Sequence, residues 1–125
     1  MSPGITFDTG ALIALERRSQ RMTEFFENAR LRRRLITIPS AVVAEWWRGR
    51  TDVRDKLLSF LFIEPLSEMI AKGAGEAIAK VKGATIVDAI VMASAASRGD
   101  IVYTSDFDDL ERLRTHFPGV RIFAV

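Results

Sequence analysis

The sequence predicts a three-layer α/β domain in which helices flank a mainly parallel central sheet. Short apolar stretches alternate with helical ones along the whole chain, which is the pattern of strand–helix–strand units. The length of 125 residues fits one domain of common size, and apolar residues make up 48% of the composition, enough for a core. We find neither an internal repeat nor a linker, so residues 1–125 are expected to form a single domain.

The first strand is expected at residues 4–8, where the stretch GITFD is apolar before its final acid. A helix follows at 10–18 and becomes polar towards its end, and residues 23–34 continue as a second helix. The side chains expected to face inward from this second helix are Phe25, Phe26, Ala29 and Leu31.

The second strand is expected at 35–39, where a proline ends it because proline cannot donate to the strand ladder. Ser40 is placed to cap the helix that follows at 41–49. Residues 53–62 are helical, and 62–66 form a short strand that a second proline ends.

The last part of the chain continues the alternation. A helix at 67–83 is weakened by its glycines, and the next helix, at 85–97, ends at Gly99, a residue suited to a left-handed cap. The chain closes with a strand at 100–106, a helix at 108–117 and a strand at 120–125.

The composition excludes several kinds of site. Without cysteine the chain has no disulfide and no thiolate metal site. The single histidine, His116, cannot build a zinc site alone. No apolar run approaches the roughly 20 residues that a membrane helix needs, so we expect a cytoplasmic protein that does not contact a membrane.

Positive charge is concentrated in the first half of the chain. Residues 1–60 hold 11 Lys and Arg against 7 Asp and Glu, whereas residues 61–125 hold 7 against 9. Fourteen of the 18 cations are arginine, whose planar guanidinium suits phosphate. A solvated face and a nucleic-acid-binding face both account for this pattern. The candidate nucleic-acid contacts are Arg17, Arg48 and Arg50.

One carboxylate stands alone in an apolar segment. In TIVDAIVMASAAS (85–97), Asp88 is surrounded by apolar or small residues, and no Lys or Arg lies three or four positions away to neutralise it. A lone carboxylate in a buried segment is destabilising by several kcal/mol unless something pairs with it. Asp88 therefore needs a partner or a function.

Three other acids are expected near the same edge of the sheet as Asp88. Asp8 and Asp106 end predicted strands, and the carboxyl ends of parallel strands form the ligand-binding edge. Glu45 lies in the helix after the second strand, and Asp88 starts the helix that leads to the Asp106 strand. Carboxylates that share a crevice repel each other unless cations intervene. Such hard oxygen ligands favour Mg²⁺ or Mn²⁺ and suit phosphodiester hydrolysis.

Each acid also has a purely structural alternative. Asp8 and Asp106 could cap the helices that follow them, and Glu45 could pair with the arginine three residues later. Asp88 stands three residues after Thr85, in the spacing of a capping box. The four alternatives are independent of each other, whereas one metal site explains all four acids.

Four segments carry a resemblance to a known family: ITFDTGALIAL, AVVAEWWRG, TIVDAIVMASA and IVYTSDFDDLERL. In this order and at these separations they resemble the PIN-domain ribonucleases, specifically the VapC-type toxins of prokaryotic toxin–antitoxin pairs. The resemblance spans nearly the whole chain and implies a PIN-like fold.

The resemblance assigns roles to particular residues. It implies that the catalytic acids, which hold the metal ion, are Asp8, Glu45, Asp88 and Asp106. It implies supporting roles around them for Thr9, Thr104 and Asp109. Gly10 stands where the family commonly has serine, so the chain lacks a hydroxyl at that place.

The resemblance also implies an activity and partners. It implies a Mg²⁺- or Mn²⁺-dependent endoribonuclease that cuts structured RNA such as tRNA or rRNA loops, is inhibited by a small cognate antitoxin and forms a homodimer. The helices at 10–18 and 21–33, with Phe25 and Phe26, are expected to contribute to an antitoxin groove. Two alternatives stay open: a non-cleaving PIN-like module that binds RNA or protein, and a structure-specific DNA nuclease.

Overall fold

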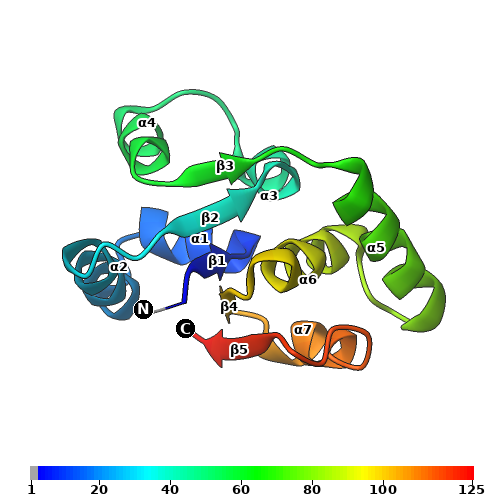
Figure 1. Ribbon diagram of the computed structural model, residues 1–125. Coiled ribbons are helices and arrows are strands. Elements are labelled where there is room, and N and C mark those ends of the chain that lie inside the picture. The colour runs from blue at the N-terminus through cyan, green and yellow to red at the C-terminus, as the bar shows by residue number, and fades with distance from the viewer. Residues whose placement is uncertain (1–2) are drawn as a thin grey trace.

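The computed structural model describes residues 3–125 and places five strands in one central sheet, with the order β3-β2-β1-β4-β5 (Figure 1). Every pair of neighbouring strands is parallel. The strands are β1 (Ile5–Phe7), β2 (Ile36–Pro39), β3 (Phe62–Glu64), β4 (Ile101–Thr104) and β5 (Arg121–Ala124). The α/β class is confirmed, and the sheet is parallel throughout rather than only mainly so.

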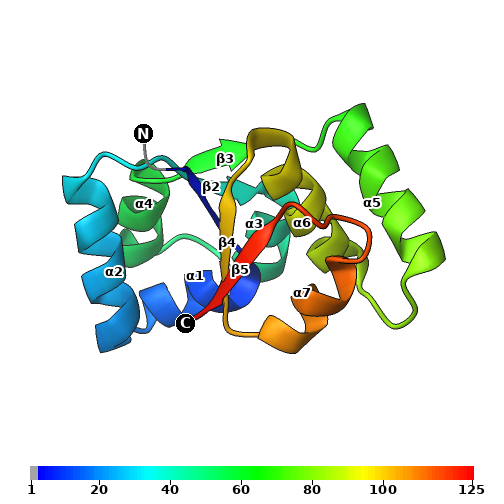
Figure 2. The ribbon, with the colours of Figure 1, turned by 60° about the horizontal axis from the view of Figure 1, so that its bottom comes forward.

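Helices cover both faces of this sheet (Figure 2). One face carries α1 (Thr9–Glu16), α2 (Gln20–Leu31) and α4 (Asp52–Ser59), and the other carries α5 (Glu68–Lys80), α6 (Ile86–Arg98) and α7 (Phe107–Leu113). The short helix α3 (Ser40–Trp46) packs against both α1 and α6. Right-handed crossovers require this division, because the chain crosses the sheet in one direction from β1 to β3 and in the other from β3 to β5. None of the helices formed by residues 3–125 is long and apolar enough to cross a membrane.

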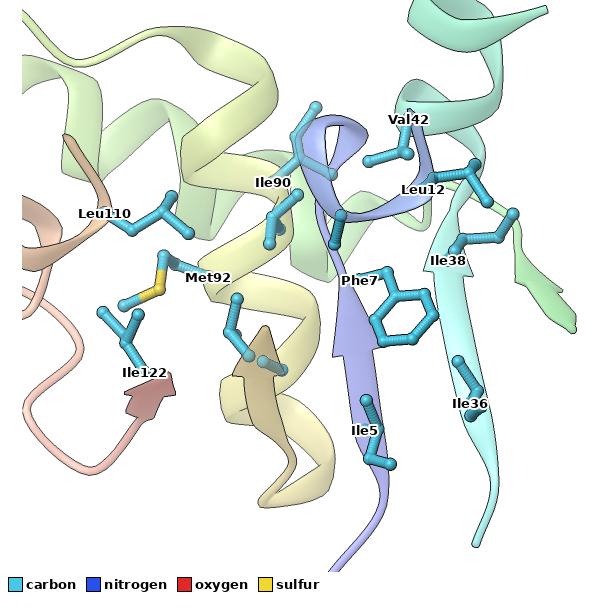
Figure 3. Close-up of a cluster of buried hydrophobic side chains, with 14 of the residues drawn as sticks. Ile5, Phe7, Leu12, Ile36, Ile38, Val42, Ile90, Met92, Leu110 and Ile122 are labelled. Carbon is cyan, nitrogen blue, oxygen red and sulfur yellow. The ribbon is translucent and has the colours of Figure 1, made fainter. Parts of the chain in front are cut away.

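The apolar core fills the space between the sheet and its helices (Figure 3). Phe7 of β1 is fully buried beside Ile38 of β2 and Leu12 of α1. On the other side of the cluster, Met92 of α6 meets Leu110 of α7. A parallel sheet with helices on both faces hides its central strands completely, which explains why these strands are apolar in sequence.

One buried layer between the sheet and α6 is polar. Arg98, at the end of α6, donates to the hydroxyl of Thr6 in β1 over 2.9 Å, and that hydroxyl donates to Asp100 over 2.9 Å. Arg98 also forms ion pairs with Asp100 (3.0 Å) and with Glu64 of β3. One guanidinium therefore neutralises two largely buried carboxylates and ties the end of α6 to the sheet, which sets the position of the whole helix.

Several helix ends differ from the sequence-based boundaries. Helix α1 ends at Glu16 because Arg18 adopts a left-handed conformation with φ 58°, and α2 ends at Leu31 with Arg33 at φ 53°. Arginine is a good helix former, so the pattern alone extended both helices too far. The left-handed cap expected at Gly99 is confirmed, with φ 73°.

Two local predictions are wrong. Leu31 is 83% exposed rather than inward-facing, because the buried stripe of α2 runs through Phe26 and Ala29 and Leu31 lies on the other side of the helix. Ser40 does not cap α3: it is the first residue of the helix, and Pro39, in extended conformation, occupies the cap position without a side-chain hydrogen bond. The strand runs directly into the helix there and leaves no separate capping residue.

Candidate active site

Four elements bring the predicted acids to the carboxyl edge of the sheet. Asp8 follows β1 directly, and Asp106 follows β4, its neighbour in the sheet. The strand order reverses between β1 and β4, which is where ligands bind in open parallel sheets. Glu45 lies on α3, which starts at the end of β2, and Asp88 lies in the first turn of α6. Because α6 returns the chain to the start of β4, its own start lies near the carboxyl edge.

Asp8 is the most buried of these acids, with 4% of its surface exposed. One carboxylate oxygen accepts the N–H of Ala11 over 2.8 Å and caps α1, and the other accepts the hydroxyl of Thr104. The pKa of Asp8 is raised to about 6: burial is the largest cause, the charges of Asp88 and Asp106 act in the same direction, and the two hydrogen bonds oppose them. The capping alternative is therefore correct for Asp8, but it does not remove the cost of burying this charge.

Asp106 is exposed and does not cap α7 with its side chain. Its N–H donates to Thr104 over 2.7 Å, so the hydroxyl of Thr104 connects Asp106 to Asp8. A hydrogen bond between the carboxyl groups of Asp106 and Asp109 raises the pKa of Asp106 and lowers that of Asp109. Asp109 therefore interacts directly with a predicted ligand.

Asp88 is half-buried at the start of α6. Thr85 caps this helix by accepting the backbone N–H of Asp88 over 3.2 Å. Burial raises the pKa of the Asp88 carboxyl, and the negative charges of Asp109 and Glu45 raise it further, whereas Thr85 and Arg112 lower it. The cap thus uses the backbone of Asp88, and the carboxylate lies within the field of the other acids.

Glu45 is exposed on α3 and accepts a hydrogen bond from the hydroxyl of Thr9 over 2.5 Å. Thr9 is the residue after Asp8, so this bond holds α3 against the start of α1. The alternative pairing of Glu45 with Arg48 does not form: Arg48 donates instead to the carbonyl of Trp47 over 2.8 Å.

The missing hydroxyl at Gly10 has a structural counterpart. A Cβ on Gly10 would lie 1.8 Å from the Oγ of Ser105, so a side chain there would require the Ser105 hydroxyl to move. Ser105 comes from the loop after β4 and places its hydroxyl in the space that a side chain at position 10 would occupy. The chain therefore has a hydroxyl beside Asp8, supplied by a different segment.

The donor set suits a hard, hydrated cation. Among residues 3–125, no three His, Cys, Asp or Glu side chains are close enough to hold a metal ion by themselves. The charges of Asp88 and Asp106 nevertheless act on Asp8, so the edge carries an excess of negative charge. Mg²⁺ is commonly bound by one or two carboxylates together with waters and substrate phosphates. The residues present fit such an ion and do not fit a closed structural metal site.

The arginines singled out in the sequence lie outside this cluster of interacting charges. Arg50 forms an ion pair with Asp55, and Arg17, the residue that follows the end of α1, is exposed to solvent. The cation that does affect the acids is Arg112 of α7, which lowers the pKa of both Asp88 and Asp109. Sequence reasoning missed it, although its position three residues after Asp109 on a predicted helix was a visible signal.

Comparison with known families decides the identity of the fold. Residues 5–115 match the PIN domain. The chain belongs to the PIN domain family. PIN domains are nucleases, that is, hydrolases that act on nucleic acids. A search of curated protein sequences gives no significant match.

Solved structures share the fold of this PIN domain over nearly its whole length. The crystal structure of DNA-bound VapBC from Salmonella typhimurium contains a chain with a TM-score of 0.74 and 20% identity, covering 98% of both chains. VapBC2 from Rickettsia felis bound to a promoter DNA fragment gives 0.73 at 17% identity, covering 97% of this chain and 98% of that chain. FitAcB from Neisseria gonorrhoeae gives 0.69 at 18% identity, covering 95% and 96%. At these identities the likeness establishes the fold.

Proposed function

We propose that this PIN domain is a metal-dependent endoribonuclease that hydrolyses RNA phosphodiester bonds and acts as the toxin of a toxin–antitoxin pair. The observation that carries the proposal is the meeting of acids from different elements at the point where the strand order reverses. Their negative charges raise one another's pKa values, as expected for a site built to receive a cation. The excess of arginine over lysine supports a nucleic-acid substrate, and structured RNA such as tRNA or rRNA is the substrate proposed.

The proposed site contains carboxylates that would hold a cation and hydroxyl groups that position those carboxylates. The residues that would hold a Mg²⁺ or Mn²⁺ ion are Asp8, Glu45, Asp88 and Asp106. When bound, such an ion makes water a stronger nucleophile and offsets the charge that develops at phosphorus. Thr104 binds both Asp8 and the backbone of Asp106, and Thr9 binds Glu45, so these hydroxyls orient the carboxylates.

Cleavage of structured RNA should require Mg²⁺ or Mn²⁺ and stop in EDTA. Direct attack by water should leave 5′-phosphate and 3′-hydroxyl ends, which sequencing of the RNA ends would identify. Undiminished cleavage by highly purified protein in EDTA would reject the mechanism, and 2′,3′-cyclic phosphate ends would indicate attack by the RNA's own 2′-hydroxyl. Preferred cleavage of DNA substrates would support the DNA nuclease, and binding of RNA without cleavage would support the non-cleaving module.

A groove between α2 and α4 is the proposed site for the antitoxin. Its volume is about 580 Å³, and its apolar lining consists of Leu15, Phe26, Val53, Leu57 and Phe60. Acidic and basic side chains surround this lining, which suits an amphipathic segment of a partner. Phe25, expected beside Phe26 in the groove, instead packs on Tyr103 with ring centroids 4.1 Å apart and belongs to the core. The VapBC and FitAcB structures, each named for a pair of components, support such a partner.

A charge placed in this groove should prevent the partner from binding. Val53 on α4 is 39% exposed, so Val53→Glu removes no core side chain. It introduces a carboxylate that the bound partner would bury. Leu35→Glu, immediately before β2, is the matched control, because this side chain is 57% exposed and lies outside the groove lining. Co-purification with a small protein encoded beside this one should fail for Val53→Glu and persist for Leu35→Glu. Equal retention of the partner by both variants would contradict this location.

The proposed homodimer would use a surface apart from this groove. Exposed apolar side chains where β3 joins α5, namely Ile63, Leu66 and Met69, support such a surface. None of these three side chains lines the antitoxin groove, so a dimer formed there would leave the groove accessible.

A further inference from the structure

Arg112 is held at the acidic edge by a neighbour on its own helix. Its Nη2 donates to Oδ1 of Asp109 over 2.7 Å, one turn earlier on α7. Both side chains are close to half exposed, at 48% and 41%. An exposed ion pair of this kind contributes little to stability. Its contribution to folding is therefore too small to explain why a guanidinium is placed beside acids that hold a catalytic ion.

The turn before α6 leaves room for this guanidinium. A Cβ on Gly83 would lie 2.9 Å from Nη1 of Arg112, so the guanidinium rests directly against the backbone of that turn. Gly83 has φ 80°, a conformation that favours glycine independently. Arg112 thus spans the space between α7 and the segment that leads into Asp88.

The charge of Arg112 opposes that of the surrounding acids. It stabilises the ionised forms of Asp88 and Asp109, whereas the charges of Asp109 and Glu45 destabilise the ionised form of Asp88. An RNA phosphate that approaches this edge meets the same repulsion. A guanidinium has five N–H donors, and the contact with Asp109 uses one of them, so a fork of donors is available to a phosphate oxygen pair.

The arginines first selected for RNA contacts are less suited to this role. Arg50 already pairs with Asp55, and Arg48 donates to a backbone carbonyl next to it. Neither is among the charges that act on Asp88 or Asp109.

We propose that Arg112, positioned by Asp109 and by the space above Gly83, binds the RNA phosphate group that lies beside the metal-holding acids. The ligand is a phosphodiester anion, bound through two guanidinium N–H groups. This inference rests on the proposed ribonuclease function and adds a substrate-binding residue to it.

The test measures RNA binding without metal, so that it does not depend on catalysis. A short, fluorescently labelled single-stranded RNA is titrated in EDTA over a range of salt concentrations with the wild type, Arg112→Ala and Arg114→Ala. Arg114 is the matched control, because it also pairs three residues back on α7, with Glu111 at 3.0 Å, at a similar exposure of 40%. Arg112→Ala should weaken binding by about 10- to 100-fold and reduce the salt slope by about 0.7, as expected for one lost phosphate contact.

Two further variants separate charge from structure. Arg112→Lys should keep the salt slope but bind more weakly than the wild type, because lysine lacks the fork. Arg112→Gln should lose as much affinity as Arg112→Ala although it can still donate to Asp109. Equal RNA affinities and slopes for Arg112→Ala and Arg114→Ala would overturn the proposal. Binding that depends on Arg112 in a protein that never cleaves RNA would support this inference and reject the proposed function, whereas cleavage unaffected by Arg112→Ala would reject the inference alone.

Discussion

Replacing Asp88 by asparagine is expected to abolish RNA cleavage and to leave the metal-free protein as stable as the wild type or more stable. The cap of α6 is kept in this variant, because the hydroxyl of Thr85 accepts the backbone N–H of residue 88, which the substitution does not change. Burial and the charges of Asp109 and Glu45 raise the pKa of the Asp88 carboxyl, so a neutral side chain relieves an unfavourable charge. The same substitution removes one of the proposed ligands of the cation.

Melting with and without Mn²⁺, measured beside cleavage, tests both parts of this result. Mn²⁺ at a hundred times its dissociation constant should stabilise the wild type by about 2.7 kcal/mol and Asp88→Asn much less. Asp108→Asn removes the same charge from an exposed position in the first turn of α7 and should retain cleavage and the Mn²⁺ response. Wild-type cleavage by Asp88→Asn would show that the ligand assignment is wrong. A purely capping role predicts normal activity and a loss of about 0.5–2 kcal/mol for Asp88→Ala.

Replacing Asp8 by asparagine is expected to stabilise the metal-free protein at neutral pH and to have little effect below pH 4. Burial raises the pKa of Asp8 to about 6 in the folded state from 3.8. The folded protein therefore binds this proton more tightly than the unfolded chain does, and its stability falls as the pH rises from about 4 to 6. A shift of this size corresponds to as much as about 3 kcal/mol above pH 7. Asparagine does not ionise and avoids this loss.

Urea unfolding in EDTA, at pH values from 4 to 8, would measure the effect. The difference in unfolding free energy between Asp8→Asn and the wild type should grow across the interval from pH 4 to 6 and then level off. Glu45→Gln removes an exposed carboxylate from the same edge and serves as the control for general charge repulsion. If Glu45→Gln gained as much unfolding free energy with the same pH dependence, burial of Asp8 would not be the cause. If Asp8→Asn gained no unfolding free energy at pH 8, Asp8 would not be a buried, ionised carboxylate at that pH.

The fold class could be predicted because the signals for it are local. Apolar strands and amphipathic helices alternate in the sequence, and the structure has strands and helices in the predicted order. Helix ends were harder to place. Arg18 and Arg33 adopt left-handed conformations just after α1 and α2, and arginine has no preference for this conformation that the sequence could have indicated. Leu31 was placed inward by its apolar character alone, and its exposure depends on the direction that α2 takes past the sheet.

Part of the site could also be located from the sequence. Asp8 and Asp106 were placed at one edge because the carboxyl ends of parallel strands must share an edge. The alternatives for each acid could not be decided in this way. Asp8 caps a helix and is also close to the charges of two other acids. Only the structure shows that both are true, because it gives the partner of each carboxylate oxygen. Whether the acids bind a metal ion stays a prediction.

By itself the sequence determined the fold class, the approximate order of elements and the residues able to carry hard-ligand chemistry. Only the tertiary structure decided which charges meet. Arg98 joins Glu64 of a distant strand, Thr9 joins Glu45, and Arg112 lies against the turn before α6. The physical reason is one of range: periodicity is set by neighbours along the chain, whereas hydrogen bonds and ion pairs require separations of a few ångströms between segments that the sequence spacing does not relate.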